Sequence, residues 1–217
     1  MSEARFKEDA LKPYEDWQAK HGTDFGVTLW ASRASQELRF KIFSEMVDLN
    51  GKRILDLGCS RGDFAAYLLA GGVEFSHYTG VDGLKDVIGF AGGRGLVRTD
   101  FRYFDLLAEG SRLVDACGGG VDVVVISGTL NTMSDDEVFR VLDAAWEVTG
   151  EVLIFNFLSD RSGRKATPQD YPARRLDSFG LMGWGFSRTP LLRYAQDYFT
   201  HGHDATIYMR KEGCGGG

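Results

Sequence analysis

The sequence has few of the residues that stabilise small secreted or metal-bound folds. It contains 4 prolines and 3 cysteines in 217 residues, and Cys59, Cys117 and Cys214 are odd in number and lack metal-ligand spacing. We therefore expect neither a disulfide framework nor a metal site. Reduced thiols are typical of a cytoplasmic protein, and this is the location that we predict.

Long apolar runs and basic blocks are also missing. The apolar runs are too short to cross a bilayer, and the charged N-terminal stretch has no apolar core of a signal peptide. The formal net charge is −6, with no dense Lys/Arg block. This balance argues against nucleic acid as the main partner. We expect a small-molecule substrate, no membrane partner, and a monomer or homodimer.

Glycine, by contrast, is abundant: 28 of 217 residues. There is no G-X-Y period, so a collagen-like chain is excluded. Many glycines separate patterns that alternate between strand and helix, which predicts βαβ units and an α/β fold with a mostly parallel sheet. The predicted strands are Arg53 to Leu57, His77 to Val81, Phe101 to Phe104, Val121 to Ile126, Val152 to Phe157, Leu191 to Tyr194 and Thr206 to Met209.

Three helices are predicted around these strands. One covers Asp63 to Ala70, and another follows a capping box formed by Ser134 and Glu137. A third precedes the first strand, with an apolar stripe made of Leu38, Ile42, Met46 and Leu49. We expect residues 1–50 to form a helical segment that caps a ligand site, residues 51–212 to form the main domain, and residues 213–217 to form a flexible Gly-rich tail.

A glycine loop follows the first predicted strand, and an acid follows the second. Gly58 and Gly62 flank a strand-to-helix turn, and Asp82 lies at the end of the next strand. In parallel α/β sheets, ligands bind beyond the carboxyl ends of the strands. An acid at that position can accept hydrogen bonds from both hydroxyls of a ribose. The pattern predicts a cofactor that contains a nucleoside.

The residues beside the glycines indicate which cofactor. Ser60 replaces the middle glycine of a dinucleotide-binding loop, and Asp56 precedes the loop. A carboxylate would repel a pyrophosphate but would attract an ammonium group. A ligand with a nucleoside end and an amino-acid end is therefore favoured over NAD.

The segment ILDLGCSRGDF, followed by YTGVD, resembles the class I S-adenosylmethionine-dependent methyltransferases. The resemblance covers about residues 52–157, with Ser60 as a departure from the usual glycine. It implies a three-layer Rossmann-like fold with a seven-stranded sheet, an antiparallel last strand, helices on both faces, and S-adenosyl-L-methionine as cofactor. It also implies that the cofactor is contacted by residues that follow the strands: Asp56, Gly58, Ser60, Gly62, Asp82, Gly83, Asp105, Leu106, Ser127 and Gly128.

Some roles stay open at this stage. Asp100 rivals Asp105 for the adenine contact, because the boundary of the third strand is uncertain. Arg39 could pair with the cofactor carboxylate, although a solvated helix face is an equal alternative. We predict Trp30, Asn156 and Tyr198 as substrate-binding residues, and Asn131 and His203 as catalytic ones. His203 would serve as the base, since imidazole titrates near neutral pH.

We therefore predict an enzyme that transfers a methyl group from S-adenosylmethionine to a hydroxyl or amine of a small polar metabolite, such as a sugar or a secondary-metabolite intermediate. The segments Gly26 to Trp30, Phe155 to Ser159 and Asp197 to Thr206 resemble a group of uncharacterised bacterial methyltransferases, which implies that both chain ends fold over the cofactor site. The alternatives are an NAD-dependent oxidoreductase and a non-catalytic protein that binds S-adenosylmethionine.

Overall fold

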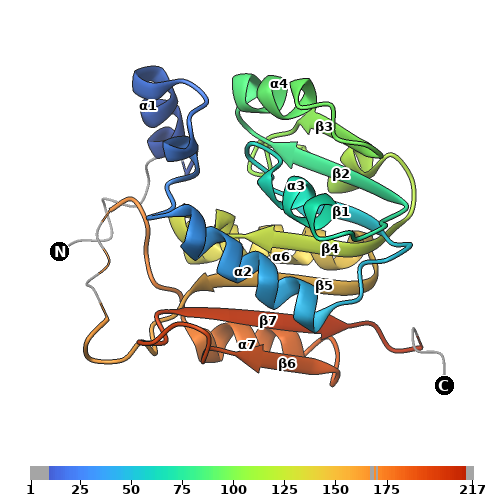
Figure 1. The fold of residues 1–217 in the computed structure, drawn as a ribbon. Coiled ribbons are helices and arrows are strands. Elements are labelled where there is room, and N and C mark those ends of the chain that lie inside the picture. Colours follow the sequence, from blue (N-terminus) through green and yellow to red (C-terminus); the bar gives the residue numbers. More distant parts are fainter. Residues whose placement is uncertain (1–9, 167–168, 170, 214–217) are drawn as a thin grey trace.

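The computed structural model describes residues 10–166, 169 and 171–213. A seven-stranded sheet forms its centre, in the order β3-β2-β1-β4-β5-β7-β6. β7 runs antiparallel to β5 and β6, and the other neighbouring pairs are parallel (Figure 1). The strands are β1 (Arg53–Leu57), β2 (His77–Asp82), β3 (Thr99–Tyr103), β4 (Val121–Ser127), β5 (Thr149–Leu158), β6 (Leu192–Ala195) and β7 (Asp204–Arg210).

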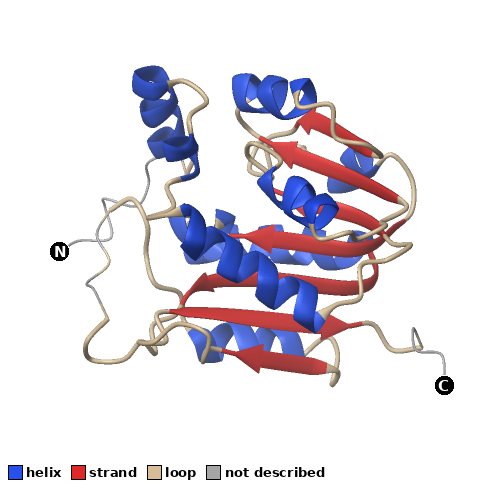
Figure 2. Ribbon diagram, viewed as in Figure 1, coloured by secondary structure: helices blue, strands red, loops and turns tan. Residues whose placement is uncertain are grey.

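Helices cover both faces of the sheet, which gives three layers (Figure 2). α2 and α3 lie on one face, and α6 and α7 lie on the other (Figure 1). The α-helices are α1 (Lys12–His21), α2 (Arg33–Met46), α3 (Asp63–Ala70), α4 (Lys85–Gly93), α5 (Leu113–Cys117), α6 (Asp135–Val148) and α7 (Ser178–Phe186), and the 3-10 turns are η2 (Phe25–Thr28) and η3 (Thr129–Thr132). Within the described residues, no helix combines the length and apolarity that crossing a membrane requires.

The period-2 alternation of each strand divides the core into two clusters. Leu55 and Phe155 point to the face covered by α5, α6 and α7, whereas Ile54 and Ile154 point to the face covered by α2 and α3. Buried aliphatic side chains on both faces of the central strands are typical of a parallel sheet enclosed by helices. The predicted fold class is therefore confirmed.

The local predictions are mostly confirmed, with small shifts at the ends of strands. α3 spans the predicted residues, and Ser134 and Glu137 form the capping box at the start of α6. β3 begins two residues earlier than predicted and ends at Tyr103. The sequence segment that contains Asp105 therefore lies beyond the strand, at the edge of the sheet where a ligand is expected.

The predicted apolar face of the helix before β1 is correct only in part, since Leu49 is buried and Met46 packs against the core, but Leu38 and Ile42 do not belong to it. Leu38, Ile42 and Met46 are only partly buried, and the buried side chains of α2 are Gln36, Arg39, Phe40 and Phe43. Phe40 and Phe43 pack against Phe64 of α3. The helix is thus rotated so that its polar residues Gln36 and Arg39 also face inward. Burial of polar groups on a helix face requires partners there, and these define part of the site described next.

Candidate functional site

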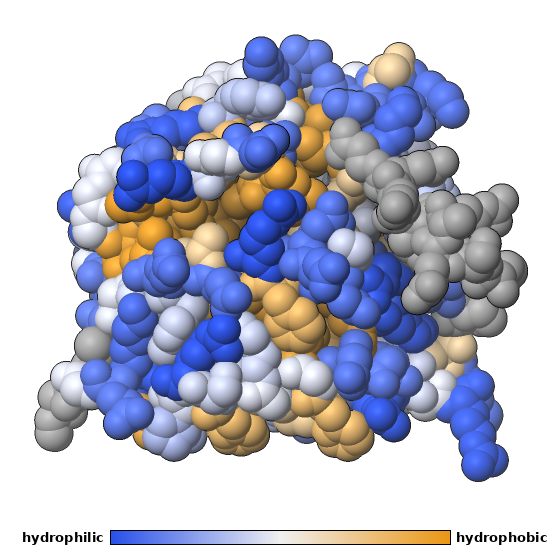
Figure 3. Space-filling view, turned by 180° about the vertical axis from the view of Figure 1, so that it is seen from behind, coloured by the Kyte–Doolittle hydropathy of each residue, from blue (hydrophilic) through white to orange (hydrophobic). Residues whose placement is uncertain are grey.

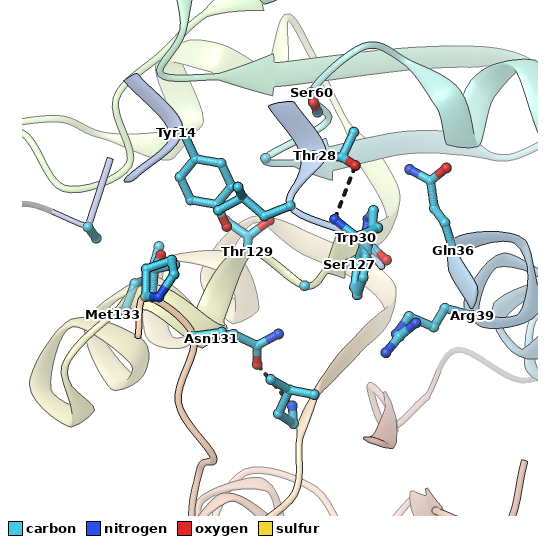
Figure 4. Close-up of a pocket in the computed structure, with 18 of the residues that line it drawn as sticks. Tyr14, Thr28, Trp30, Gln36, Arg39, Ser60, Ser127, Thr129, Asn131 and Met133 are labelled. Atoms are coloured by element: carbon cyan, nitrogen blue, oxygen red, sulfur yellow. Dashed lines mark hydrogen bonds between the residues drawn. The ribbon is translucent and has the colours of Figure 1, made fainter. Parts of the chain in front are cut away.

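A cavity of about 670 Å³ lies at the carboxyl ends of β1, β2 and β4. This is the place where the strand order reverses, since β1 pairs with β2 on one side and with β4 on the other. Residues of α1, η2 and α2 line the opposite wall, among them Tyr14, Thr28 and Gln36 (Figure 4). The space-filling view shows a recessed band of apolar surface on the face seen from behind (Figure 3).

The glycine loop after β1 turns sharply because three of its residues have positive φ. These are Gly58 (+75°), Ser60 (+46°) and Gly62 (+68°). The N–H groups of Gly58 and Cys59 both donate to the carbonyl oxygen of Val81, which ties the loop to the end of β2. A Cβ at Gly58 would overlap the side chain of Thr129, so this position has room only for glycine.

Gly58 and Ser60 line the cavity, whereas Gly62 does not. A Cβ at Gly62 would lie 2.7 Å from the ring of Phe101, so its small size serves the packing of α3 on the sheet. The structure thus gives Gly62 a packing role, and its expected ligand contact stays a prediction. Ser60 instead takes part directly, because its N–H donates to Asp82 Oδ2 at 2.9 Å.

Asp56 lines the cavity and is 3% exposed. Its carboxyl group accepts a hydrogen bond from the hydroxyl group of Tyr78. Burial raises the pKa of Asp56 to about 7, although the Tyr78 hydroxyl acts in the opposite direction. A cationic group bound in the cavity beside Asp56 would stabilise its ionised form.

Asp82 and Gly83 line the cavity from the end of β2. The two oxygens of Asp82 accept from different backbone N–H groups, Oδ2 from Ser60 and Oδ1 from Leu84 at 3.0 Å. Burial raises the pKa of Asp82, and these backbone donors oppose the effect. Two fixed donors hold the carboxylate in one orientation, while each oxygen keeps a lone pair for a ligand hydroxyl.

Asp105 and Leu106 line the cavity beyond β3, whereas Asp100 does not. Asp105 Oδ1 accepts from the N–H of Leu107 at 2.9 Å, which fixes the turn after the strand. Asp100 forms a partly exposed ion pair with Arg102. Of the two acids considered for the adenine contact, only Asp105 has the position that the contact requires.

The end of β4 contributes Ser127 and Gly128, which both line the cavity. Asn156 holds them in place from behind: its Oδ1 accepts from Gly128 N–H at 2.8 Å, and its Nδ2 donates to Ser127 Oγ at 3.2 Å. Asn156 is fully buried and does not line the cavity. Its predicted contact with substrate stays a prediction, and in this structure both ends of its amide are bonded to the β4 loop instead.

Trp30 lines the cavity and packs against the end of β4. Its ring occupies the space that a Cβ at Gly128 would need. The guanidinium group of Arg39 lies 4.1 Å from the centre of the Trp30 ring and 4.6 Å from that of Phe199. This stack joins the N-terminal segment to the residues before β7.

Arg39 lines the cavity, but its forked partner is Asp204 rather than a ligand. Arg39 Nε donates to Asp204 Oδ2 at 2.8 Å, and Nη1 donates to the carbonyl oxygen of Ser35. Tyr198 donates to Asp204 Oδ1 at 2.7 Å and does not line the cavity. The pairing of Arg39 with the cofactor carboxylate and the substrate contact of Tyr198 stay predictions; in this structure a buried acid that we had not singled out, Asp204, binds both side chains.

The two predicted catalytic residues, Asn131 and His203, both line the cavity. Asn131 Oδ1 accepts from Leu158 N–H at 2.9 Å, and the amide nitrogen points into the cavity (Figure 4). The His203 ring lies 4.4 Å from the ring of Phe199. Burial lowers the pKa of His203; the charge of Asp204 opposes this shift, and the charges of Arg39 and Arg175 add to it. A neutral imidazole at neutral pH is able to accept a proton.

Sequence reasoning missed Tyr14 and Met133, which line the cavity. Burial raises the pKa of Tyr14 to about 12, so its hydroxyl group stays protonated. Met133 follows η3, and its place after a strand end was the one signal that could have indicated it. Tyr14 has no such signal, because α1 is distant in sequence from every strand. In the described part of the chain, no group of three or more His, Cys, Asp or Glu side chains is arranged to hold a metal ion.

The sheet order and the loop after β1 define the Rossmann-like fold of the class I S-adenosylmethionine-dependent methyltransferases. Several solved structures match nearly the whole chain. Magnesium protoporphyrin IX methyltransferase (ChlM) from Synechocystis PCC 6803, with bound SAM, is 13% identical, with a TM-score of 0.64 over 94% of this chain and 98% of that one. The DhpI-SAM-HEP complex is 15% identical, with a TM-score of 0.64 over 96% and 99%.

Phosphoethanolamine N-methyltransferase 1 from Haemonchus contortus is 13% identical, with a TM-score of 0.70 over all of this chain and 52% of that one. The sequence matches no protein-family model and no curated protein. At identities this low, the similarity establishes the shared fold, and the chemistry has to be argued from the cavity itself.

Proposed function

We propose that this protein is an S-adenosylmethionine-dependent methyltransferase that methylates a hydroxyl or amine of a small polar metabolite. The observation that carries the proposal is Asp82, which is fixed by two backbone N–H groups at the edge of the cavity and faces the loop after β1. A carboxylate in this place is suited to the two hydroxyls of a ribose. Asp105 would accept from an adenine amine beyond β3.

Asp56 supports the choice of cofactor. Its buried carboxyl group has a raised pKa, and the hydroxyl group of Tyr78 is its hydrogen-bond partner. The ammonium group of an amino-acid end would stabilise the carboxylate, whereas a pyrophosphate would repel it. The buried carboxyl group at this position therefore fits S-adenosylmethionine better than NAD. When bound, this cofactor supplies a sulfonium methyl group for in-line transfer to a nucleophile.

The chain's own residues would orient the acceptor and take its proton. The amide nitrogen of Asn131 points into the cavity, where it would donate to the acceptor, and His203 would accept a proton as the neutral imidazole. A cavity of about 670 Å³ lies within the size range of small-ligand sites. Its enclosure by the N-terminal segment and the net charge of −6 favour a metabolite over nucleic acid. We also propose that the protein acts in the cytoplasm as a monomer or homodimer.

Calorimetric titration with S-adenosylhomocysteine, the product of methyl transfer, tests the proposal. The Asp82→Asn variant should bind at least about tenfold more weakly, because a hydrogen bond to a charged group is worth about 1.5–3 kcal/mol. Asp100→Asn is the matched control, because it removes the charge of an acid on the neighbouring strand β3 that does not line the cavity. Equal affinities for the two variants would contradict the assignment of Asp82.

A thermal-shift comparison addresses the alternative cofactor. A ligand that binds only the folded state raises the unfolding temperature. We expect a shift with S-adenosylmethionine and none with NAD, and the opposite pattern would favour an oxidoreductase. Formation of S-adenosylhomocysteine in the presence of a metabolite extract would distinguish an enzyme from a protein that only binds the cofactor.

A further inference from the structure

Gln36 is a polar side chain buried in the wall of the cavity. It lies on α2, is 5% exposed, and lines the cavity. The other buried polar side chains in this wall each form a hydrogen bond within the protein: Thr28, Arg39, Asp56 and Asn131. Within the described residues, the side-chain amide of Gln36 forms none. A buried amide without a partner is unfavourable, and such a group in a cavity indicates that a ligand supplies the missing bond.

The contacts of α2 place Gln36 at the end of the cavity that the glycine loop forms. Phe40, one turn further along α2, packs against Phe64 in the first turn of α3, with 4.9 Å between the ring centroids. α3 begins directly after the loop that carries Ser60, and Phe64 and Ser60 both line the cavity. The amide of Gln36 extends toward the side of the cavity where Ser60 lies, and Asn131 lies across the cavity from it (Figure 4). Gln36 therefore faces the proposed cofactor site rather than the proposed acceptor.

The arginine beside Gln36 on the same helix is already used within the protein. Arg39 donates to Asp204 through Nε and Nη2, and to the carbonyl oxygen of Ser35 through Nη1. The amide of Gln36 is different, because it has a donor to spare and carries no charge. A cation in its place would compete with a bound ammonium group for the carboxyl group of Asp56, which lines the same cavity. A neutral donor leaves Asp56 to the ammonium group.

We propose that Gln36 recognises the amino-acid end of the cofactor: its Nε2 donates to the carboxylate of S-adenosylmethionine, while Asp56 meets the ammonium group. The inference rests on the proposed function and adds a specificity-determining residue to it. A donor reserved for this carboxylate selects a cofactor that keeps its amino-acid end. The cofactor thereby supplies a partner to an amide that has none in the free protein.

The proposal has a consequence for the free protein. An amide without a partner is no better for stability than an apolar side chain of similar size, so Gln36→Leu should leave the unfolding temperature unchanged or raise it. Gln196→Leu is the matched control, because the Gln196 amide donates to the carbonyl oxygens of Arg161 and Gly202 at 2.9 and 2.5 Å and does not line the cavity. This second variant should lower the unfolding temperature by at least about 2 °C and leave the affinity for cofactor unchanged.

Calorimetric titration of the full chain measures the ligand side. S-adenosylhomocysteine carries the whole amino-acid end, whereas its decarboxylated analogue keeps the ammonium group and lacks the carboxylate. Gln36→Leu should bind S-adenosylhomocysteine at least about tenfold more weakly than wild type, because a hydrogen bond to a charged group is lost. It should bind the decarboxylated analogue with wild-type affinity. Gln36→Met keeps the length of the side chain without its donor, and the same results are expected for it.

Three results would overturn the proposal. The first is an unchanged affinity of both Gln36 variants for S-adenosylhomocysteine. The second is equal weakening for the two ligands, which would assign the amide to another part of the cofactor. The third is a lower unfolding temperature of both free Gln36 variants than of wild type, which would mean that the amide has a partner within the protein.

The proposed function is checked separately, by the binding of S-adenosylhomocysteine to wild type. If wild type and the Gln36 variants bind it equally well, only the role of Gln36 is rejected. If wild type does not bind it, the proposed function is rejected, and the role of Gln36 is rejected with it.

Discussion

The buried carboxyl group of Asp56 leads to a prediction about protons. Burial raises the pKa of Asp56 to about 7, so at pH 6 the group is mostly neutral. The ammonium group of a bound cofactor beside it would favour the carboxylate. Binding of S-adenosylhomocysteine at pH 6 should therefore release a proton from the protein.

The size of the effect follows from the pKa. A group with a pKa of about 7 is about 90% protonated at pH 6, so up to about 0.9 proton should be released per cofactor bound. The affinity should rise about tenfold between pH 6 and pH 8, as the fraction of ionised Asp56 in the free protein rises. In the Asp56→Asn variant both effects should disappear.

Calorimetry in buffers with different ionisation enthalpies measures this release directly, because the observed heat then depends on the buffer. Tyr78→Phe provides a second check: its hydroxyl group lowers the pKa of Asp56, so without it more proton should be released at pH 7. A heat of binding at pH 6 that is the same in every buffer would refute the reasoning. A release that persists in Asp56→Asn would assign the proton to another group, with Asp82 as the first candidate.

The same carboxyl group affects stability without any ligand. Its pKa is higher in the folded protein than the usual value of 3.8, so the folded state holds the proton more tightly. The resulting stabilisation is present below about pH 4 and is lost as the pH rises toward 7, to a total of about 4 kcal/mol. Urea unfolding over this range should show a steeper slope in wild type than in Asp56→Asn, because the raised pKa values of Asp82 and Asp204 contribute to both proteins.

Two further substitutions test how the site is held. Gly58→Ala should lower the free energy of unfolding, measured with urea, by more than the ~1–2 kcal/mol that a left-handed backbone alone costs, because the new Cβ overlaps Thr129. Gly72→Ala is the control: its φ is +76° and the space around it is open, so it should lower the free energy of unfolding by that amount only. Asp204→Asn should lower the free energy of unfolding by about 3–5 kcal/mol, because the charge of Arg39 is left without its buried partner. A loss below about 1 kcal/mol would mean that Arg39 is balanced in another way.

Local patterns were sufficient to predict most of the fold. The β-branched stretch at β4 and the capping box of α6 each specify their element without help from the rest of the chain. The face of α2 was mispredicted in part for a physical reason: Leu38 and Ile42 form an apolar stripe at helical spacing, yet Phe40 and Phe43 bury more surface against α3. Which of two apolar faces turns inward depends on the neighbouring helix, and the sequence of one helix does not contain that information.

The cofactor side of the site was easier to predict than the acceptor side, because its residues follow consecutive strands. Parallel strands bring their carboxyl ends to one edge, so Asp56, Asp82 and Asp105 could be grouped from their positions in the sequence. The structure favours Asp105 for the third position, because β3 ends at Tyr103 and leaves Asp105 outside the strand and at the cavity. Residue spacing alone did not decide between this acid and Asp100.

On the acceptor side, the decisive contacts join residues that no local pattern connects. Arg39 and Asp204 are 165 positions apart; the sequence offered Arg39 for the cofactor carboxylate or for solvent, and nothing in it singled out Asp204 as the partner. A buried ion pair of this kind is a poor source of stability compared with apolar side chains of the same volume. The ion pair instead fixes the position of the Arg39 guanidinium group against Trp30, and it thereby holds the N-terminal segment in one arrangement at the start of β7.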